Sequence, residues 1–247
     1  MRGRPLQDPA RQLERAHRIL DAAAELILRW GYDKTTLEDV AGRAGVAKGT
    51  LYLHWKSRDE LFSALLRRER VRMLVEVRRS DPQTLRDLLS QLAAGVLGRP
   101  LMRAILLSGG AVLGKLARQK QRSTSALELG EAFRVYLGRL AELGAVRTDL
   151  AEGEPYLLVS STVYGFLTLQ AALPEDQRTP DDRLAALMAD AGVRVLGADG
   201  VATEQVTQAT RAYLGTIADL SDRKLAESLG GLAAGSAGTS SKAASPQ

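Results

Sequence analysis

The stretch that most constrains the fold runs from residue 35 to residue 56, with the sequence TTLEDVAGRAGVAKGTLYLHWK. Its apolar residues repeat at intervals of three and four, which is typical of helices with one buried face, and Gly45 interrupts the repeat. Glycine adopts a left-handed backbone conformation without steric cost, so it can end the first helix there. The pattern predicts two short helices joined by a tight turn, with Leu51 and Trp55 facing inward on the second helix.

Small residues stand where two such helices would touch. A steep crossing through a short turn needs a small residue at the contact, and Ala41 meets this requirement. Gly45 follows four residues later, and Leu51 can support the second helix from below. These features indicate a helix-turn-helix, for which an ordinary helical hairpin is the alternative when the stretch is taken alone.

Two candidate capping boxes precede the first of these helices. Thr35 stands three residues before Glu38, and Thr36 three residues before Asp39. Either pair can satisfy the free N–H groups of the first turn, and the sequence leaves both pairings open.

The flanking segments are also helical in pattern. Apolar residues from Leu13 to Trp30 recur at intervals of three and four, after Asp8 and Pro9 and before Gly31. Residues 57–60 offer a further capping box at the start of a long fourth helix.

Residues 19–66 resemble the DNA-binding domain of TetR-family transcriptional regulators. The resemblance rests on Ile19-Leu20, Ala22-Ala23, Gly31-Tyr32, Thr35-Thr36, Val40-Ala41, Ala44-Gly45-Val46, Gly49-Thr50-Leu51-Tyr52, His54-Trp55 and Leu61. Two positions depart from the family pattern. Arg58 replaces a frequent lysine, which preserves a phosphate contact, and Ala47 replaces a frequent serine, which removes a hydroxyl.

The resemblance implies that the second helix enters the major groove of DNA. Residues near its start would reach base edges or phosphates, and Thr36 would meet a phosphate at a helix N-terminus. The residues predicted to bind DNA are Arg2, Arg4, Thr35, Thr36, Arg43, Ala47, Lys48, Gly49, Thr50, Tyr52, His54, Lys56 and Arg58. Arg2 and Arg4 belong to an Arg-Gly-Arg-Pro motif that suits the minor groove, with a plain basic tail as the alternative.

The charge of the chain is concentrated near its start. The 247 residues carry a net charge of +5, and residues 1–80 hold 17 Lys/Arg against 11 Asp/Glu, a net +6. A polyanionic partner for this part follows, although some arginines on its helices would only face solvent. The chain has no cysteine, and the sequence predicts no catalytic residue, no metal site and no cofactor.

Helical spacing continues to the end of the chain, so the predicted fold is all-α. The N-terminal three-helix helix-turn-helix domain would be followed by a larger helical domain for ligand binding and dimerisation. The predicted divisions are a basic arm (1–9), the helix-turn-helix domain (10–56), the regulatory and dimerisation domain (57–198), a C-terminal helical extension (199–232) and a disordered tail (233–247). Expected helices in the regulatory domain include one that begins at Asp81-Pro82 and another near 111–119.

Residues 155–174 contain no charged side chain. Acidic rather than basic residues flank this segment, and it contains several hydroxyl groups, so we interpret it as a buried helix and not as a membrane span. The N-terminus lacks the apolar core of a signal peptide, and a bacterial cytoplasmic location is expected.

By the resemblance, the helices at 155–173 and 181–196 would pack against their copies in a dimer, for which a central helix of a monomer is the alternative. The predicted interface residues are Leu158, Ser161, Gly165, Thr168, Ala172, Leu184, Leu187 and Met188. The effector pocket would lie between helices of the same domain and take an apolar or amphipathic small molecule. Its predicted lining residues are Leu92, Val96, Met102, Phe133, Tyr136, Leu137, Tyr164 and Thr168, each of which could instead be plain core.

The leading prediction is therefore a ligand-responsive repressor that binds a palindromic double-stranded DNA operator as a homodimer and is released by a small molecule. An architectural DNA-binding protein without an effector is the alternative. A helical enzyme is disfavoured because the two histidines, His17 and His54, both lie in the DNA-binding part and no acid–base pair or phosphate loop is present.

Overall fold

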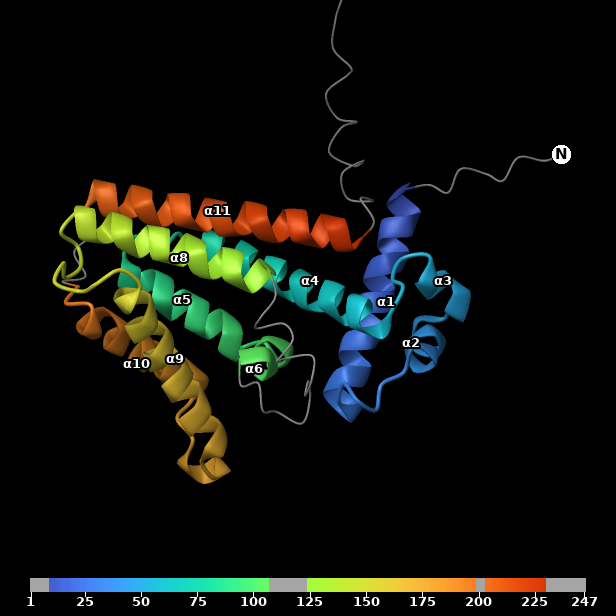
Figure 1. Cartoon of the computed structure of the whole chain (residues 1–247). Coiled ribbons are helices and arrows are strands. Elements are labelled where there is room, and N and C mark those ends of the chain that lie inside the picture. Colours follow the sequence, from blue (N-terminus) through green and yellow to red (C-terminus); the bar gives the residue numbers. More distant parts are fainter. Residues whose placement is uncertain (1–8, 107–123, 199–202, 230–247) are drawn as a thin grey trace, which may run out of the picture. The chain divides into compact units, whose positions relative to one another are not determined.

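The computed structural model describes residues 9–106, 124–198 and 203–229, and within these ranges the chain forms ten α-helices and one short 3-10 helix with no strand (Figure 1). The all-α prediction is thereby confirmed. Arg2, Arg4, the predicted helix near 111–119 and the predicted tail at 233–247 lie outside the described residues.

The chain divides into two compact units. The first unit contains the residues up to Arg68 together with those from Asp222 onward, and the second contains Glu69–Ser221. Two helices, α4 (Arg58–Arg79) and α11 (Glu204–Ser228), contribute residues to both units. The division differs from the predicted boundary at residue 56.

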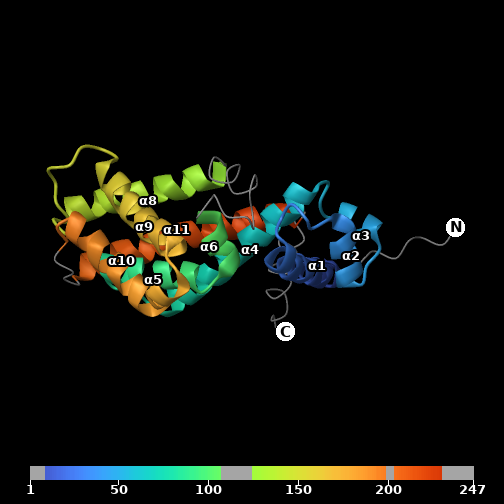
Figure 2. The same ribbon diagram turned by 90° about the horizontal axis from the view of Figure 1, so that it is seen from below.

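Three helices form the N-terminal part of the first unit: α1 (Pro9–Trp30), α2 (Leu37–Ala44) and α3 (Lys48–Tyr52). In both views α2 and α3 lie beside α1 (Figures 1 and 2). The start of α4 joins them, because the Tyr32 hydroxyl bonds the Asp59 carboxylate and the Tyr32 and Phe62 rings meet edge to face at 4.9 Å. The core is fully buried and apolar, and it includes Ala16, Ile19, Leu20, Ala23, Ile27, Val40, Leu51, Leu61, Phe62 and Leu65.

A buried cation also ties α4 to α1. Arg68 is 2% exposed, donates to the backbone carbonyl of His17 at 3.0 Å and pairs with the Asp21 carboxylate at 2.8 Å. A buried charge must be paired and hydrogen-bonded to be tolerated, and these contacts meet that demand. The first turns of α4 therefore belong to the first unit, which explains why it extends beyond residue 56.

The turn between α2 and α3 has the conformation expected from the sequence. Gly45 lies in the left-handed region at φ 66° and ψ 37°, and its N–H bonds the last turn of α2. The next amide, of Val46, bonds the Ala41 carbonyl at 3.0 Å. These two bonds end α2, and the left-handed turn at Gly45 sets the direction in which the chain continues into α3.

The second unit packs α5 (Leu85–Leu97), α6 (Pro100–Leu106), α8 (Thr124–Glu142), α9 (Glu154–Ala172), the 3-10 helix η1 (Glu175–Gln177), α10 (Asp181–Val195) and most of α11. Helix α10 contacts both α5 and α9, and α9 contacts α8. A Cβ added to Gly192 would lie 2.7 Å from the end of the Leu89 side chain, so glycine lets α5 and α10 approach closely. Helices α8 and α11 lie side by side in both views (Figures 1 and 2).

Helix α5 starts three residues later than a helix opening at Pro82 would. Thr84 is its N-cap, with a φ of −127°, and a capping box links the Thr84 side chain to Asp87. This box satisfies free N–H groups of the first turn, which explains why the helix begins at Leu85.

None of the described helices is long and apolar enough to cross a membrane. The uncharged segment predicted to be a buried helix is α9, but only Val159 and Leu167 on it are fully buried, and much of the rest is half-buried or exposed.

Two glycines of this region provide a matched test of the turn. No atom lies within 4 Å of the position that a Cβ would take at Gly45 or Gly42, so neither substitution by alanine meets a steric clash with a neighbour. Gly45→Ala should destabilise the first unit by about 1–2 kcal/mol, because a left-handed backbone disfavours a side chain. Gly42→Ala should stabilise it by about 0.5–1 kcal/mol, because Gly42 is helical. Denaturant unfolding followed by the fluorescence of Trp30 and Trp55, both in this unit, measures each change. Equal effects at the two positions would contradict the assigned turn.

Candidate nucleic-acid interface and ligand pocket

The predicted recognition helix, α3, is anchored from one side only. Leu51 is fully buried and Trp55 is 2% exposed, while Lys48, Gly49 and Tyr52 lie on the exposed side. Leu53, which the sequence analysis did not select, is 68% exposed at the end of the same face. The exposed side of the helix thus carries a cation, a glycine and an aromatic ring.

Gly49 and Ala47 bear on how closely a partner can approach. No atom lies within 4 Å of the position that a Cβ would occupy at Gly49, so nothing in the described fold requires a glycine there. Close approach of an external group to the backbone is a remaining reason for it. Ala47 is the N-cap of α3 and its side chain makes no capping bond. A serine would add one, worth about 1 kcal/mol.

Two cations of this face are paired within the chain. Lys48 pairs with Glu38 of α2, and Arg43 pairs with Glu25 of α1 at 2.6 Å. All four side chains are about half exposed. Exposed ion pairs contribute about 0–1 kcal/mol, so a DNA phosphate could replace either carboxylate at little cost.

The two threonines before α2 differ in burial and in their hydrogen-bond partners. The Thr36 hydroxyl and backbone N–H bond the Asp39 carboxylate at 2.7 and 3.0 Å, and Thr36 accepts from the Asp39 N–H at 3.2 Å. These bonds lower the pKa of Asp39. A phosphate at Thr36 would have to displace this carboxylate. Thr35 is fully buried and its hydroxyl donates to the Gly31 carbonyl at 2.8 Å, so its side chain is not available to DNA.

Arg58 has an internal role that the sequence did not reveal. Its guanidinium lies over the Tyr32 ring, 4.3 Å from the centroid. One of its nitrogens lies 3.3–3.4 Å from the carbonyl oxygens of Tyr32, Asp33 and Thr35. The predicted phosphate contact does not fit this placement, because the cation is used to hold the loop between α1 and α2. Lys56 and Thr50 remain at the surface, Thr50 only in part.

His54 is half-buried, with its ring 5.2 Å from that of Trp55. Burial and the nearby cation Arg15 lower its pKa, so the imidazole is neutral at neutral pH. It can bond a phosphate through an N–H but adds no positive charge to the face.

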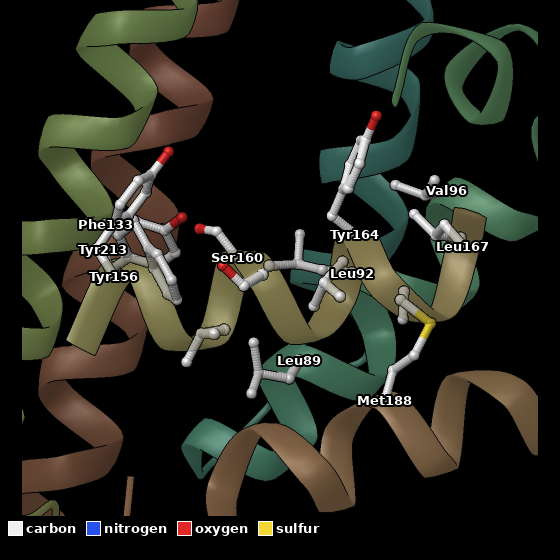
Figure 3. A pocket seen from close by; sticks show the side chains of 14 residues that line it. Leu89, Leu92, Val96, Phe133, Tyr156, Ser160, Tyr164, Leu167, Met188 and Tyr213 are labelled. Carbon is white, nitrogen blue, oxygen red and sulfur yellow. The ribbon is translucent and has the colours of Figure 1, made fainter. Parts of the chain in front are cut away.

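The second unit contains a cavity of about 510 Å³ between α5, α8, α9, α10 and α11 (Figure 3). None of its lining residues is charged. They are Leu89, Leu92, Ala93, Val96, Phe133, Tyr156, Val159, Ser160, Ser161, Val163, Tyr164, Leu167, Met188 and Tyr213. Such a lining favours a ligand that is apolar or carries its charge outside the cavity.

Aromatic rings gather at one end of the cavity. Figure 3 shows Phe133, Tyr156 and Tyr213 together there, whereas Val96, Leu167 and Met188 lie at the other end. The Tyr213 ring stacks on Tyr136 with centroids 4.8 Å apart, and the Tyr136 hydroxyl lies 2.9 Å from that of Thr210. Burial raises the pKa of Tyr136 to about 12 and that of Tyr213 further, so both hydroxyls stay protonated.

The structure brings together part of the predicted pocket. Leu92, Val96, Phe133 and Tyr164 line the cavity. Met102, Tyr136 and Leu137 do not line it and are buried as core, and Thr168 is exposed on α9. Tyr156 and Tyr213 were missed, because their place depends on which helices meet α8 and no local pattern contains that information.

The predicted dimer residues fall into two groups. Ser161, Gly165, Thr168 and Ala172 are exposed on α9, and Leu158 is half-buried. Leu184 and Met188 are only 2% and 1% exposed, because they pack in a cluster with Ala93, Leu97 and Leu167 of the same chain. They present no surface to a partner, and Leu187 is half-buried. No group of three or more possible metal ligands occurs in the described part of the chain.

Comparison with known proteins agrees with this geometry. Residues 19–65, which contain α2, α3 and most of α1, match the model for the tetR family of bacterial regulatory proteins. Over these residues the chain is similar to that family. The chain is 39% identical over 83 residues to the HTH-type transcriptional activator FasR of Mycolicibacterium smegmatis, over 34% of this chain and 37% of that protein. It spans about a third of the length of the curated relatives it matches.

Solved structures match a larger share of the chain. The SmeT–triclosan complex is 23% identical, with a TM-score of 0.56, over 74% of this chain and 91% of that one. The transcriptional regulator FadR from Bacillus subtilis in complex with stearoyl-CoA is 17% identical, with a TM-score of 0.53, over 75% of this chain and 98% of that one. At these identities the likeness shows the fold alone, in which a small N-terminal helical domain precedes a larger helical domain.

The low pKa of His54 predicts a pH dependence of stability. Because burial and Arg15 disfavour the imidazolium, the unfolded chain binds a proton more readily than the folded chain. The folded chain therefore keeps its full stability above a pH of about 6.5, where His54 is neutral in both states. This contribution to the free energy of unfolding is lost as the pH falls through the lower folded-state pKa. Urea unfolding followed by tryptophan fluorescence should show a falling midpoint between pH 7.5 and 5.5. His54→Gln should reduce that fall, and an unchanged slope would show that another group causes it.

Proposed function

We propose that this chain is a ligand-responsive transcriptional repressor that binds a near-palindromic DNA operator as a dimer and is released by a small molecule. The observation that carries the proposal is the anchored helix α3 with Lys48, Gly49 and Tyr52 on its exposed face. Its place in the segment that is similar to the tetR family supports this use of the face. A protein with this role would act in the bacterial cytoplasm, where the operator lies.

Several DNA contacts follow for this face. Lys48 and Thr50 would read base edges or phosphates, Gly49 would let the backbone approach, and Tyr52 and His54 would bond phosphate oxygens. Arg43 and Lys56 would add charge at the edges of the site. Thr36 would join only if a phosphate replaces Asp39, and Arg58 would act by holding the loop before α2.

An exposed apolar face on α9 supports a dimer. Leu157 is 62% exposed, Leu169 is 63% exposed and Tyr164 is 45% exposed, with Ser161 and Gly165 between them. Contiguous apolar patches on a surface commonly mark interfaces, and small residues allow two helices to approach closely. A second copy of this chain is the proposed partner, and two recognition helices about 34–36 Å apart would then read a near-palindrome.

The uncharged cavity supports an apolar or amphipathic effector. Its lining offers hydroxyl groups from Ser160 and Tyr156 but no charge to neutralise an ionised group. Two proteins of the same fold have been solved with triclosan and with stearoyl-CoA. A ligand that prefers a conformation with another spacing of the two DNA-binding domains would shift the population away from DNA.

The architectural alternative differs in specificity. An architectural protein would bind most duplexes with similar affinity, whereas a repressor should prefer its operator by ~10³-fold or more. Repeated selection from a random pool of 30-bp duplexes separates the two functions. Enrichment of a near-palindromic sequence supports the repressor, and a pool that stays random supports the alternative.

Single substitutions on α3 test the proposed face. Against the enriched duplex, Lys48→Ala and Tyr52→Ala should each weaken binding at least about tenfold, since one good contact is worth about 1–3 kcal/mol. Arg134→Ala removes one exposed charge from α8 and serves as the control, with affinity close to that of the wild type. All four proteins should sediment as dimers. Full retention of the duplex by both α3 variants would remove these side chains from the contact set.

Filling the cavity tests the effector site. Ser160→Phe places a ring in the cavity and should abolish binding of the apolar dye N-phenyl-1-naphthylamine while leaving duplex binding intact. Thr216→Phe is the matched control, because Thr216 lines a more polar groove between α8 and α11. Dye fluorescence titrations measure both. Equal dye binding by the two variants would place the apolar site elsewhere.

A further inference from the structure

The end of helix α11 belongs to the unit that contains the recognition helix. The indole N–H of Trp55 donates to the backbone carbonyl of Ser228 at 2.9 Å, across 173 positions of sequence. Arg67 of α4 donates to the Ser228 hydroxyl, and Leu229 is 1% exposed. The side chain of Trp55, which follows α3, thus holds the last turn of α11.

These bonds satisfy groups on both sides. The last four carbonyl groups of an α-helix have no partner within the helix, and they carry the negative end of its dipole. Trp55 and Arg67 supply an N–H donor and a cation at that end. Conversely, Trp55 is 2% exposed, and a buried indole N–H requires an acceptor. The Ser228 carbonyl is the acceptor that the structure provides.

Trp55 is placed to influence the angle of α3. It follows the recognition helix by three residues, and its own amide bonds the Leu51 carbonyl at 2.8 Å. Leu51 is the fully buried residue of α3. A change in the position of the Trp55 ring would therefore move the exposed face that carries Lys48 and Tyr52.

We propose that the last turn of α11 together with the residue that follows it, Lys224–Leu229, is a positioning element of the recognition helix. It sets the orientation of α3 through Trp55 without itself contacting DNA, and it does so from the C-terminal extension of the chain. The inference rests on the proposed DNA-binding function.

The full-length chain with Trp30→Phe provides a direct reporter. Trp55 is then the only tryptophan, and its emission reports whether the ring is buried. In this background Leu229→Asp disrupts the buried end of α11, and Asp222→Ala, at an exposed position of the same helix, is the matched control. Leu229→Asp should shift the emission to longer wavelength, and Asp222→Ala should not. Trp55→Phe, made in the wild type, removes the N–H donor together with the five-membered ring and keeps an aromatic side chain, and it is the second variant should Leu229→Asp fail to fold.

Discrimination between duplexes separates positioning from mere stabilisation. Affinities are measured for the duplex enriched by the wild type and for a scrambled duplex of equal composition, with far-UV circular dichroism confirming that each protein is folded. Leu229→Asp should lower affinity for the enriched duplex by about tenfold or more, and Trp55→Phe by a smaller factor. Binding to the scrambled duplex depends on charge and should weaken only slightly.

Four results would overturn the inference. Unchanged Trp55 emission in Leu229→Asp would show that the end of α11 is not seated on this ring. Shifted emission with unchanged discrimination would show that α11 only covers Trp55. A wild-type protein that discriminates between no duplexes would overturn the proposed function as well, whereas normal wild-type discrimination retained by both variants would overturn this inference alone.

Discussion

The burial of Leu51 and Trp55 is the constraint on which the proposed interface depends. Helix α3 has five residues, and isolated helices shorter than about 12–15 residues are marginal in water. Its N-cap, Ala47, offers no side-chain bond. The helix therefore persists because Leu51 and Trp55 bury their side chains and because Gly45 aims the chain into it. The face proposed to bind DNA is left exposed because the residues that anchor the helix lie on the opposite face.

Basic residues near the start of the chain serve two purposes that net charge does not distinguish. Arg68 is buried against Asp21 and the His17 carbonyl, and Arg58 is held over Tyr32 beside three carbonyl oxygens. These cations stabilise the domain and contribute little to a DNA-facing surface. Lys48 and Arg43 are exposed in weak pairs that a phosphate can replace. The charge excess thus agrees with the proposed DNA partner but overstates the number of contacts.

Local patterns predicted the elements better than their packing. The all-α fold, the end of α2 at Gly45 and the Thr36–Asp39 capping box follow from spacing within a few residues. The sequence could not tell that Thr35 is buried, since both threonines offered the same spacing to an acidic residue. Tyr213 lies far along the chain from Phe133, so its place beside the cavity depends on tertiary packing. Leu184 and Met188 have the apolar character of an interface, but α5 covers them within the chain.

Helix α9 contributes both to the proposed effector pocket and to the proposed dimer interface. One side of it, including Val159 and Leu167, lines the cavity, and the other side exposes Leu157 and Leu169. Protein interiors are close-packed, so a ligand larger than the cavity must displace a helix that bounds it. Displacement of α9 would move the face on which the partner copy is proposed to pack. A ligand could then change the spacing of two recognition helices without contacting either, because pocket and interface share a single helix.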